Sequence, residues 1–150
     1  MKTGARPGMT QLINFFSYGD LSLVDLPGYG YAAAPGAVRE TFPSMMREYF
    51  ERRSNLKLVC LLLDIRREPS DLDIQVANLL ADLSVPTALV LTKADKESGN
   101  GRVNRRKAVA GALGLEAADL FLTSSEKRTG LSELWKMIRG QLYPKTPVDK

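Results

Sequence analysis

The segment Asp25-Leu26-Pro27-Gly28 directly follows a mostly apolar stretch, residues 21–24. An acid at the end of a strand can hold a magnesium ion, usually through water. A glycine three residues later lets a backbone N–H approach a phosphate, because no Cβ stands in the way. The same D-x-x-G pattern also occurs in ordinary turns, so this segment alone does not decide between a turn and a phosphate site.

A second segment, Thr92-Lys93-Ala94-Asp95, follows the apolar stretch 86–91 and matches the T/N-K-x-D pattern of guanine-binding sites. The Asp95 carboxylate offers two acceptor oxygens to the N1–H and N2–H2 donors of guanine, and adenine cannot satisfy both. Lys93 would lay its aliphatic stem over the base. The alternative interpretation is an aspartate that caps a helix after a strand.

Two further segments carry hydroxyl groups. In residues 123–127, a tight loop could point the backbone N–H of Ser125 at a carbonyl such as guanine O6; a serine-rich helix N-cap is the alternative. Thr10 precedes the first apolar stretch, and a loop threonine can complete a magnesium shell or contact a γ-phosphate. A lone threonine carries little information, so Thr10 depends on the other segments for its interpretation.

Apolar stretches place these segments at the ends of predicted strands. The five predicted strands cover residues 11–16, 21–24, 58–65, 86–91 and 120–123. The turn Tyr18-Gly19-Asp20 makes the first two an antiparallel pair. The third and fourth are apolar without alternation, which is typical of strands in a parallel sheet that helices cover on both faces.

Between the strands, apolar side chains recur with helical period. The stripe from Leu72 to Leu83 predicts a helix, with Ser70 or Asp71 as its N-cap. Residues 131–142 predict another, and we expect its Trp135 in the core.

Two further segments complete the pattern of helices. Residues 38–50 share an apolar face, but Pro43 predicts a kink or a helix that begins near Thr41. The basic segment 102–113 predicts a helix that Gly114 ends. Strands alternating with helices after a hairpin indicate an α/β fold with a mostly parallel sheet, in which ligands bind beyond the carboxyl ends of the strands.

Composition limits the class of protein. The chain has 150 residues, enough for one domain, and its 44% hydrophobic and 25% charged residues are typical of a soluble globular fold. Histidine is absent and Cys60 is the single cysteine, which excludes Ser-His-Asp, Cys-His and His-based zinc chemistry. We expect Cys60 to be a small core residue. The longest apolar run, 56–65, is far shorter than the roughly 20 residues of a membrane-spanning helix, so we expect a cytoplasmic protein without a membrane span.

A loop threonine, D-x-x-G, T-K-x-D and S-S-x occur in this order, and each of the last three lies at the carboxyl end of a predicted strand. In this arrangement the chain resembles the translation-factor-type GTPases, and more narrowly the EngB (YihA/YsxC) family of ribosome-biogenesis GTP-binding proteins. The string DLPGYGYA is specific to that family. The residues that carry the resemblance are 7–16, 24–32, 63–66, 71–73 and 91–96.

The resemblance implies a P-loop GTPase-like, three-layer α/β fold and one G domain over residues 1–150, from switch I to the C-terminal helix. It implies that Thr10 is the switch I threonine, that Thr10 and Gly28 serve catalysis at the γ-phosphate, and that Thr10 and Asp25 hold Mg²⁺. Tyr29 stands where some GTPases have a water-orienting glutamine, so we expect slow intrinsic hydrolysis. The residues implied to bind GTP or GDP are Asp25, Gly28, Thr92, Lys93, Asp95, Ser124 and Ser125.

The resemblance further implies GTP hydrolysis coupled to assembly of the large ribosomal subunit, needed for normal cell division and septation, by a protein that we expect to be a monomer. A net charge of +4 suits an rRNA partner, and the basic cluster in residues 102–107 could meet rRNA or form a solvated helix face. The alternative function is a degenerate, non-hydrolysing ribosome- or protein-binding module. A third reading, an unrelated doubly wound fold with another phosphate ligand, would need all these patterns to coincide by accident.

The sequence contains no G-x-x-x-x-G-K-[S/T] loop, whose backbone N–H groups and lysine cradle phosphates in P-loop GTPases. Residues 4–8 hold two glycines without the lysine or hydroxyl that should follow. We therefore expect that the first strand, the phosphate loop and the first helix, about 30 residues or more, are missing from this chain. This chain alone would then hydrolyse GTP poorly, and its exposed apolar sheet edges would lower its stability.

Overall fold

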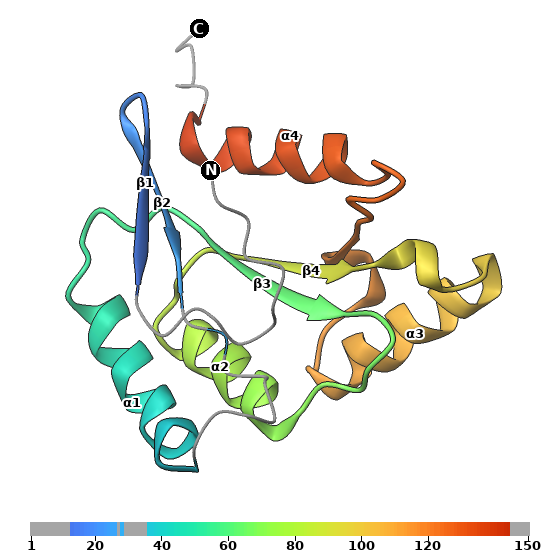
Figure 1. The fold of residues 1–150 in the computed structure, drawn as a ribbon, viewed down its shortest axis with the longest axis horizontal. Helices are drawn as coiled ribbons and strands as arrows, with labels where there is room; N and C mark the ends of the chain where they lie inside the picture. Colours follow the sequence, from blue (N-terminus) through green and yellow to red (C-terminus); the bar gives the residue numbers. More distant parts are fainter. Residues whose placement is uncertain (1–12, 27, 29–35, 145–150) are drawn as a thin grey trace, which may run out of the picture. The chain divides into compact units, whose positions relative to one another are not determined.

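A computed structural model describes residues 13–26, 28 and 36–144, with only the backbone described for residues 36–41 (Figure 1). The chain divides into two compact units, residues 1–46 and 47–150, and each is described separately below.

In the first unit, strands β1 (Asn14–Tyr18) and β2 (Leu21–Asp25) pair antiparallel, with Asn14 opposite Asp25 and Tyr18 opposite Leu21. The two residues between the strands form the turn, and Gly19 has a φ of +60°. Tight two-residue turns between paired strands need positive φ, which glycine adopts without a steric cost. The predicted hairpin is confirmed, and it ends at Asp25.

Helix α1 (Gly36–Glu51) spans the boundary between the two units and contains Pro43. Of the two alternatives for this segment, a helix that begins near Thr41 is wrong, since α1 begins five residues earlier, at Gly36, and the kink at Pro43 stays a prediction. A proline inside a helix loses one backbone hydrogen bond, at a cost of about 3 kcal/mol. Phe42, Met46 and Phe50 are spaced one helical turn apart and all three are buried, and this burial offsets the cost of the proline.

The second unit is built on a parallel sheet. Its strands are β3 (Val59–Asp64), β4 (Thr87–Thr92) and β5 (Leu120–Leu122), in the order β3-β4-β5. Asp64 lies opposite Thr92, and Leu91 lies opposite Leu122, so the carboxyl ends of all three strands meet at one edge. The three predicted strands are confirmed to within one or two residues.

Helices cover both faces of this sheet, with α2 and α3 on one side and α4 on the other (Figure 1). Their bounds are Asp71–Asp82 for α2, Gly99–Ala112 for α3 and Leu131–Leu142 for α4. Two short 3₁₀ helices, η1 (Ala94–Lys96) and η2 (Ala117–Asp119), lie in the connections. Ser70 caps α2 as predicted: its Oγ accepts from the backbone N of Asp73 at 3.2 Å, and the Asp73 carboxylate accepts from the Ser70 N at 2.8 Å. Gly114 ends α3 as predicted, with a φ of +68°.

The core of the second unit lies between β4 and the helices. Strand β4 is buried on both faces from Ala88 to Leu91, and Ile65 directly after β3 is fully buried. The other buried apolar side chains of the strands and of helices α2 and α3 are Leu61, Leu63, Leu72, Val76, Leu79, Leu80, Val109, Ala110 and Leu120. In the described part of the chain, none of the helices is long and apolar enough to cross a bilayer.

Two expectations about the core are wrong. Cys60 is exposed, as is Leu62 at 61%, because strand side chains alternate and only the face of β3 that carries Leu61 and Leu63 is buried. Trp135 is 56% exposed on α4. The half-buried side of that helix carries residues 134, 137, 138 and 142, which have the three- and four-residue spacing of one helix face, and Trp135 lies at the edge of this face.

Leu62 and Leu63 provide a matched test of the core assignment. Leu63→Ala should lower the free energy of unfolding by about 3 kcal/mol, because it removes a buried side chain and leaves a cavity. Leu62→Ala should lower it by less than about 1 kcal/mol, because that side chain is already in water. Urea unfolding followed by circular dichroism measures both, and equal losses would contradict the assignment of the buried face.

Candidate functional site

The T-K-x-D segment lies at the carboxyl end of β4. Thr92 is the last residue of the strand, and its Oγ1 donates to the Leu63 carbonyl of β3 at 3.0 Å. Lys93 then adopts the left-handed conformation, with φ 60° and ψ 33°, which ends the strand and starts η1. The backbone N of Ala94 donates to the Thr123 carbonyl at 3.0 Å, which ties η1 to the chain after β5.

Asp95 lies inside η1 with a side chain only 6% exposed. Its Oδ1 accepts a hydrogen bond from Ser124 Oγ at 2.5 Å, and its Oδ2 lies 3.1 Å from Lys96 Nζ. The alternative interpretation of Asp95 as a helix cap does not hold, because Lys93 occupies the N-cap position of η1 and Ser98 that of α3. The carboxylate therefore belongs to a polar cluster at the sheet edge.

The loop after β5 closes on itself around Ser124, which is fully buried. Ser124 and Thr129 exchange backbone hydrogen bonds of 3.0 and 3.1 Å, and Ser124 Oγ accepts from the Lys127 N at 3.0 Å. This serine does not cap α4, whose N-cap is Gly130. Ser125 is exposed at the loop. The structure thus brings the T-K-x-D and S-S segments together through one hydrogen bond.

Ser124 and one cation, Lys96, contact the Asp95 carboxylate. The hydrogen bond from Ser124, and then the contact with Lys96, lower the pKa of Asp95 below its ordinary value. Lys96 also lies 2.7 Å from Glu126, and this carboxylate together with Asp95 raises the pKa of Lys96. At neutral pH Asp95 is therefore an ionised acceptor, the state that a donor-rich edge such as that of guanine requires.

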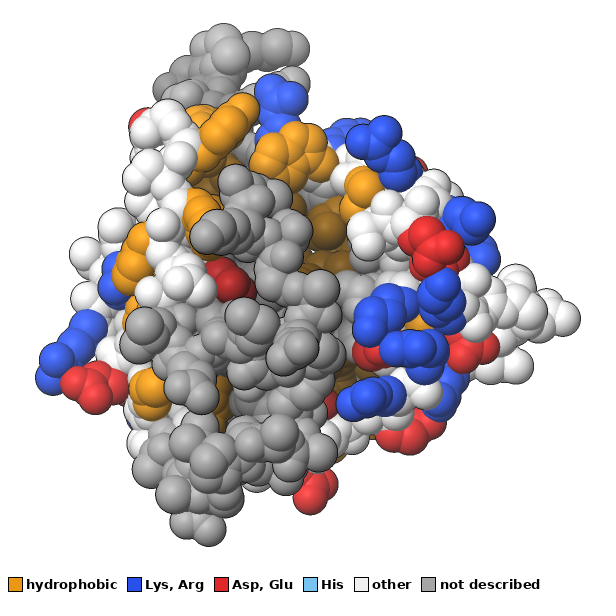
Figure 2. Space-filling model, viewed as in Figure 1, with side chains coloured by type: hydrophobic (Ala, Val, Ile, Leu, Met, Phe, Trp, Pro, Cys, Tyr) orange, Lys and Arg blue, Asp and Glu red, His pale blue; other side chains and the backbone are white. Residues whose placement is uncertain are grey.

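Two arginines of the basic cluster in residues 102–107 hold backbone of η1 and β5. Arg102 Nε donates to the Ala94 carbonyl of η1 at 2.7 Å, and Arg106 Nη2 donates to the Leu120 carbonyl of β5 at 2.5 Å. Figure 2 shows Lys and Arg side chains interleaved with Asp and Glu side chains on the α3 side of the molecule. These two arginines donate to backbone carbonyls. Neither interpretation of the basic segment, as an rRNA-binding cluster or as a solvated helix face, predicts this role.

A carboxylate whose role the sequence had left unassigned stands at the end of β3. Asp64 Oδ2 lies 2.7 Å from Arg66 Nη2 and 2.9 Å from Lys93 Nζ. The hydrogen bonds from Arg66, with a smaller contribution from Lys93, lower the pKa of Asp64 far below its ordinary value. The signal was present in the sequence, since Asp64 ends an apolar strand as Thr92 does, but the pairing with Lys93 depends on which strands are neighbours.

The D-x-x-G segment belongs to the other unit. Asp25 is the last residue of β2, and both Asp25 and Gly28 are exposed. Thr10 and Tyr29 lie outside the described residues. The roles of Thr10, Asp25 and Gly28 at magnesium and the γ-phosphate therefore stay predictions.

A parallel sheet between two layers of helices, with T-K-x-D and S-S segments joined at the carboxyl ends of its strands, defines the α/β fold of the P-loop GTPase class. Residues 1–93 of the chain match a family model described as 50S ribosome-binding GTPase. The chain is 43% identical over 147 residues to the probable GTP-binding protein EngB of Geotalea daltonii, covering 97% of this chain and 71% of that protein. The chain belongs to the EngB family.

Two further comparisons agree with this assignment. The chain is 45% identical over 139 residues to the probable GTP-binding protein EngB of Pelobacter propionicus, covering 92% of this chain and 70% of that protein. A crystal structure of a probable GTP-binding protein engB superposes with a TM-score of 0.73 at 20% identity, covering 90% of this chain and 82% of that one. The family and the fold class inferred from the motifs are both confirmed.

Gly130 and Gly114 test the packing of the loop that carries Ser124 and Ser125. Both have positive φ, but a Cβ on Gly130 would lie 1.8 Å from the Leu122 carbonyl oxygen, whereas nothing lies within 4 Å of one on Gly114. We expect Gly114→Ala to lower the free energy of unfolding by about 1 kcal/mol, the cost of the left-handed conformation alone. Gly130→Ala should cost clearly more, because backbone must move. Thermal unfolding compares the two, and equal losses would contradict the close approach.

Asp64 gives a prediction about pH. Because its pKa is lower in the folded chain than in the unfolded one, where it is about 3.9, its ion pairs stabilise the fold above that pH and lose this effect as the pH falls below it. The difference in unfolding free energy between the parent chain and Asp64→Asn should be constant from about pH 8 to about pH 5 and shrink below about pH 4. Urea unfolding at each pH measures it. A difference that persists undiminished at about pH 2 would contradict the ion pairing.

Proposed function

We propose that the chain binds GTP and GDP through a guanine site formed by residues 92–95 and 123–125. The observation that carries the proposal is the hydrogen bond between Ser124 and Asp95, which joins two segments 29 positions apart. Family membership supports the same ligand, since the relatives are described as probable GTP-binding proteins.

In this site the Asp95 carboxylate accepts from N1–H and N2–H2 of guanine, and the stem of Lys93 covers the face of the base. Lys93 is 52% exposed along its side chain, so its methylene groups are open to such contact. The backbone N–H of Ser125, in the loop that Ser124 closes, donates to guanine O6. Thr92 holds the end of β4 against β3 and so fixes where Lys93 begins.

We further propose that Asp25, Gly28 and Thr10 contact the magnesium ion and the phosphates of the nucleotide. A carboxylate and a hydroxyl are the hard oxygen donors that Mg²⁺ prefers, and the exposed Asp25 at the end of β2 fits an ion that keeps several of its waters. A bound Mg²⁺ neutralises charge on the β- and γ-phosphates. The backbone N–H of Gly28 would approach the γ-phosphate, where a side chain would obstruct it.

We further propose that residues 1–150 act as one cytoplasmic, monomeric G domain whose GTP hydrolysis is coupled to assembly of the large ribosomal subunit and serves cell division and septation. The match to a family described as 50S ribosome-binding GTPase supports the ribosomal partner. Because Tyr29 replaces a water-orienting glutamine, hydrolysis by the chain itself is slow.

Asp95→Asn tests the guanine site. An amide matches the edge of xanthine better than that of guanine, so the variant should lose at least about tenfold in affinity for GDP and gain affinity for XDP. Equilibrium titration with a fluorescent GDP, competed by GDP, XDP, GTP and ATP, measures the change. Asp82→Asn, which removes an exposed carboxylate of the same charge from α2, is the matched control and should keep the parent's preference for guanine.

Two results would count against the proposed site. A folded parent chain that binds GDP no better than ATP lacks a guanine site. A ribosome- or protein-binding module without nucleotide specificity would show no difference between Asp95→Asn and Asp82→Asn.

A further inference from the structure

The strand end at Asp64 lies next to the proposed base site without belonging to it. Asp64 is opposite Thr92 in the parallel register, one residue before Lys93, and its side chain is 17% exposed. Residues 63–66 are among those that carry the resemblance to the EngB family, but the sequence assigns them no role. A largely buried carboxylate needs partners, and these partners indicate what it does.

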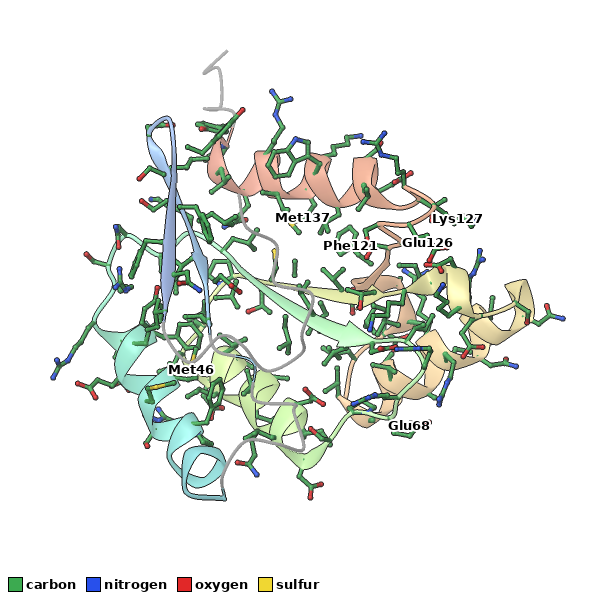
Figure 3. All side chains as sticks on the ribbon, viewed as in Figure 1. Met46, Glu68, Phe121, Glu126, Lys127 and Met137 are labelled. Atoms are coloured by element: carbon green, nitrogen blue, oxygen red, sulfur yellow. The ribbon has the colours of Figure 1, made fainter. Side chains whose placement is uncertain are left out.

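Arg66 fixes the orientation of the Asp64 carboxylate. Arg66 Nε donates to Oδ1 at 2.9 Å and Nη2 donates to Oδ2 at 2.7 Å, while the backbone N of Arg66 donates to Oδ1 at 3.1 Å. A planar guanidinium that holds both oxygens leaves the carboxylate little freedom to rotate. The loop itself is tied to α3, because Arg105 Nη2 donates to the Arg66 carbonyl at 2.6 Å and Arg105 also pairs with Glu68. Figure 3 shows Glu68 in this loop, after the end of β3.

The oriented carboxylate holds Lys93. Its Oδ2 lies 2.9 Å from Lys93 Nζ, so the lysine side chain runs from the end of β4 toward the end of β3. The backbone of Lys93 is left-handed, a conformation that a lysine adopts at some cost. The backbone of this residue and the end of its side chain are therefore both held in place. A free lysine side chain has many rotamers, and ordering it before the ligand arrives lowers the entropy cost of binding.

We propose that Asp64, oriented by Arg66, is a positioning residue that holds the stem of Lys93 in the place where it covers the guanine base. This inference rests on the proposed guanine site. The pair with Lys93 adds only a small part of the stability that Asp64 contributes, because Lys93 is 52% exposed and the hydrogen bonds from Arg66 are the larger cause of the lowered pKa. The effect of the Asp64–Lys93 pair is therefore expected in nucleotide affinity.

A double-mutant cycle tests the coupling. Asp64→Asn should weaken GDP binding by about tenfold in the parent chain and have no further effect in a Lys93→Ala background, because the stem that it positions is then gone. Glu68→Gln is the matched control: this carboxylate lies in the same loop and pairs with Arg105, without a contact to Lys93, and GDP affinity should stay at the parent value. Equal losses from Asp64→Asn in both backgrounds, or no loss in the parent, would overturn the proposal.

A second measurement does not need nucleotide. Labelling of folded chains with an amine-reactive reagent, read by mass spectrometry, should modify Lys93 several times faster in Asp64→Asn than in the parent and in Glu68→Gln. If the parent fails to bind GDP, the proposed function is wrong, whatever the labelling shows. If the parent binds GDP but Lys93 labels equally fast in all three chains, the positioning role of Asp64 is wrong and the guanine site stands.

Discussion

The hydrogen bond from Ser124 to Asp95 is the contact on which the arrangement of the site depends. Ser124 is fully buried, and a buried hydroxyl must be paired, so its donation to Asp95 and its acceptance from the Lys127 N satisfy both of its roles. The same bond keeps the Asp95 carboxylate ionised and in place at the sheet edge. Without it, the loop after β5 and the 3₁₀ turn after β4 would be held together by the backbone hydrogen bond from Ala94 to Thr123 and by the exposed ion pair of Lys96 with Glu126.

In the second unit, residues 47–150, charged side chains mainly hold backbone and other side chains in position. Arginines of α3 donate to carbonyls of η1 and of the loop after β3, so the ends of β4 and β3 are tied to one rigid helix, and Arg106 holds the first residue of β5. Hydrogen bonds between a guanidinium and a carbonyl are stronger than neutral ones, since one partner is charged. A site preorganised in this way loses little entropy when a planar base enters, which favours discrimination between bases by hydrogen bonds at their edges.

Two backbone positions with positive φ lie near the carboxyl edge of the sheet. Lys93 is left-handed without being glycine, and Gly130 sits where any side chain would meet the Leu122 carbonyl. Lys93 lies where β4 ends and η1 begins, and Gly130 lies where the loop after β5 meets α4. Such conformations persist where the surrounding contacts determine them, as the Asp64 ion pair and the Ser124–Thr129 backbone pairing do here.

The sequence by itself determined the order of strands and helices, the parallel sheet, the caps at Ser70 and Gly114 and the identity of the T-K-x-D and S-S segments, because apolar periodicity and turn chemistry act over a few residues. It could not show that α1 runs through Pro43, that Cys60 and Trp135 are exposed, or that arginines of α3 turn to backbone carbonyls. Nor could it show that Asp64 pairs with Lys93 or that Ser124 donates to Asp95. Tertiary structure alone decided these features. The helix through Pro43 and the exposed residues depend on what packs against each element, and the pairings of Asp64 and Ser124 depend on which strands are neighbours and on contacts between residues about 30 positions apart.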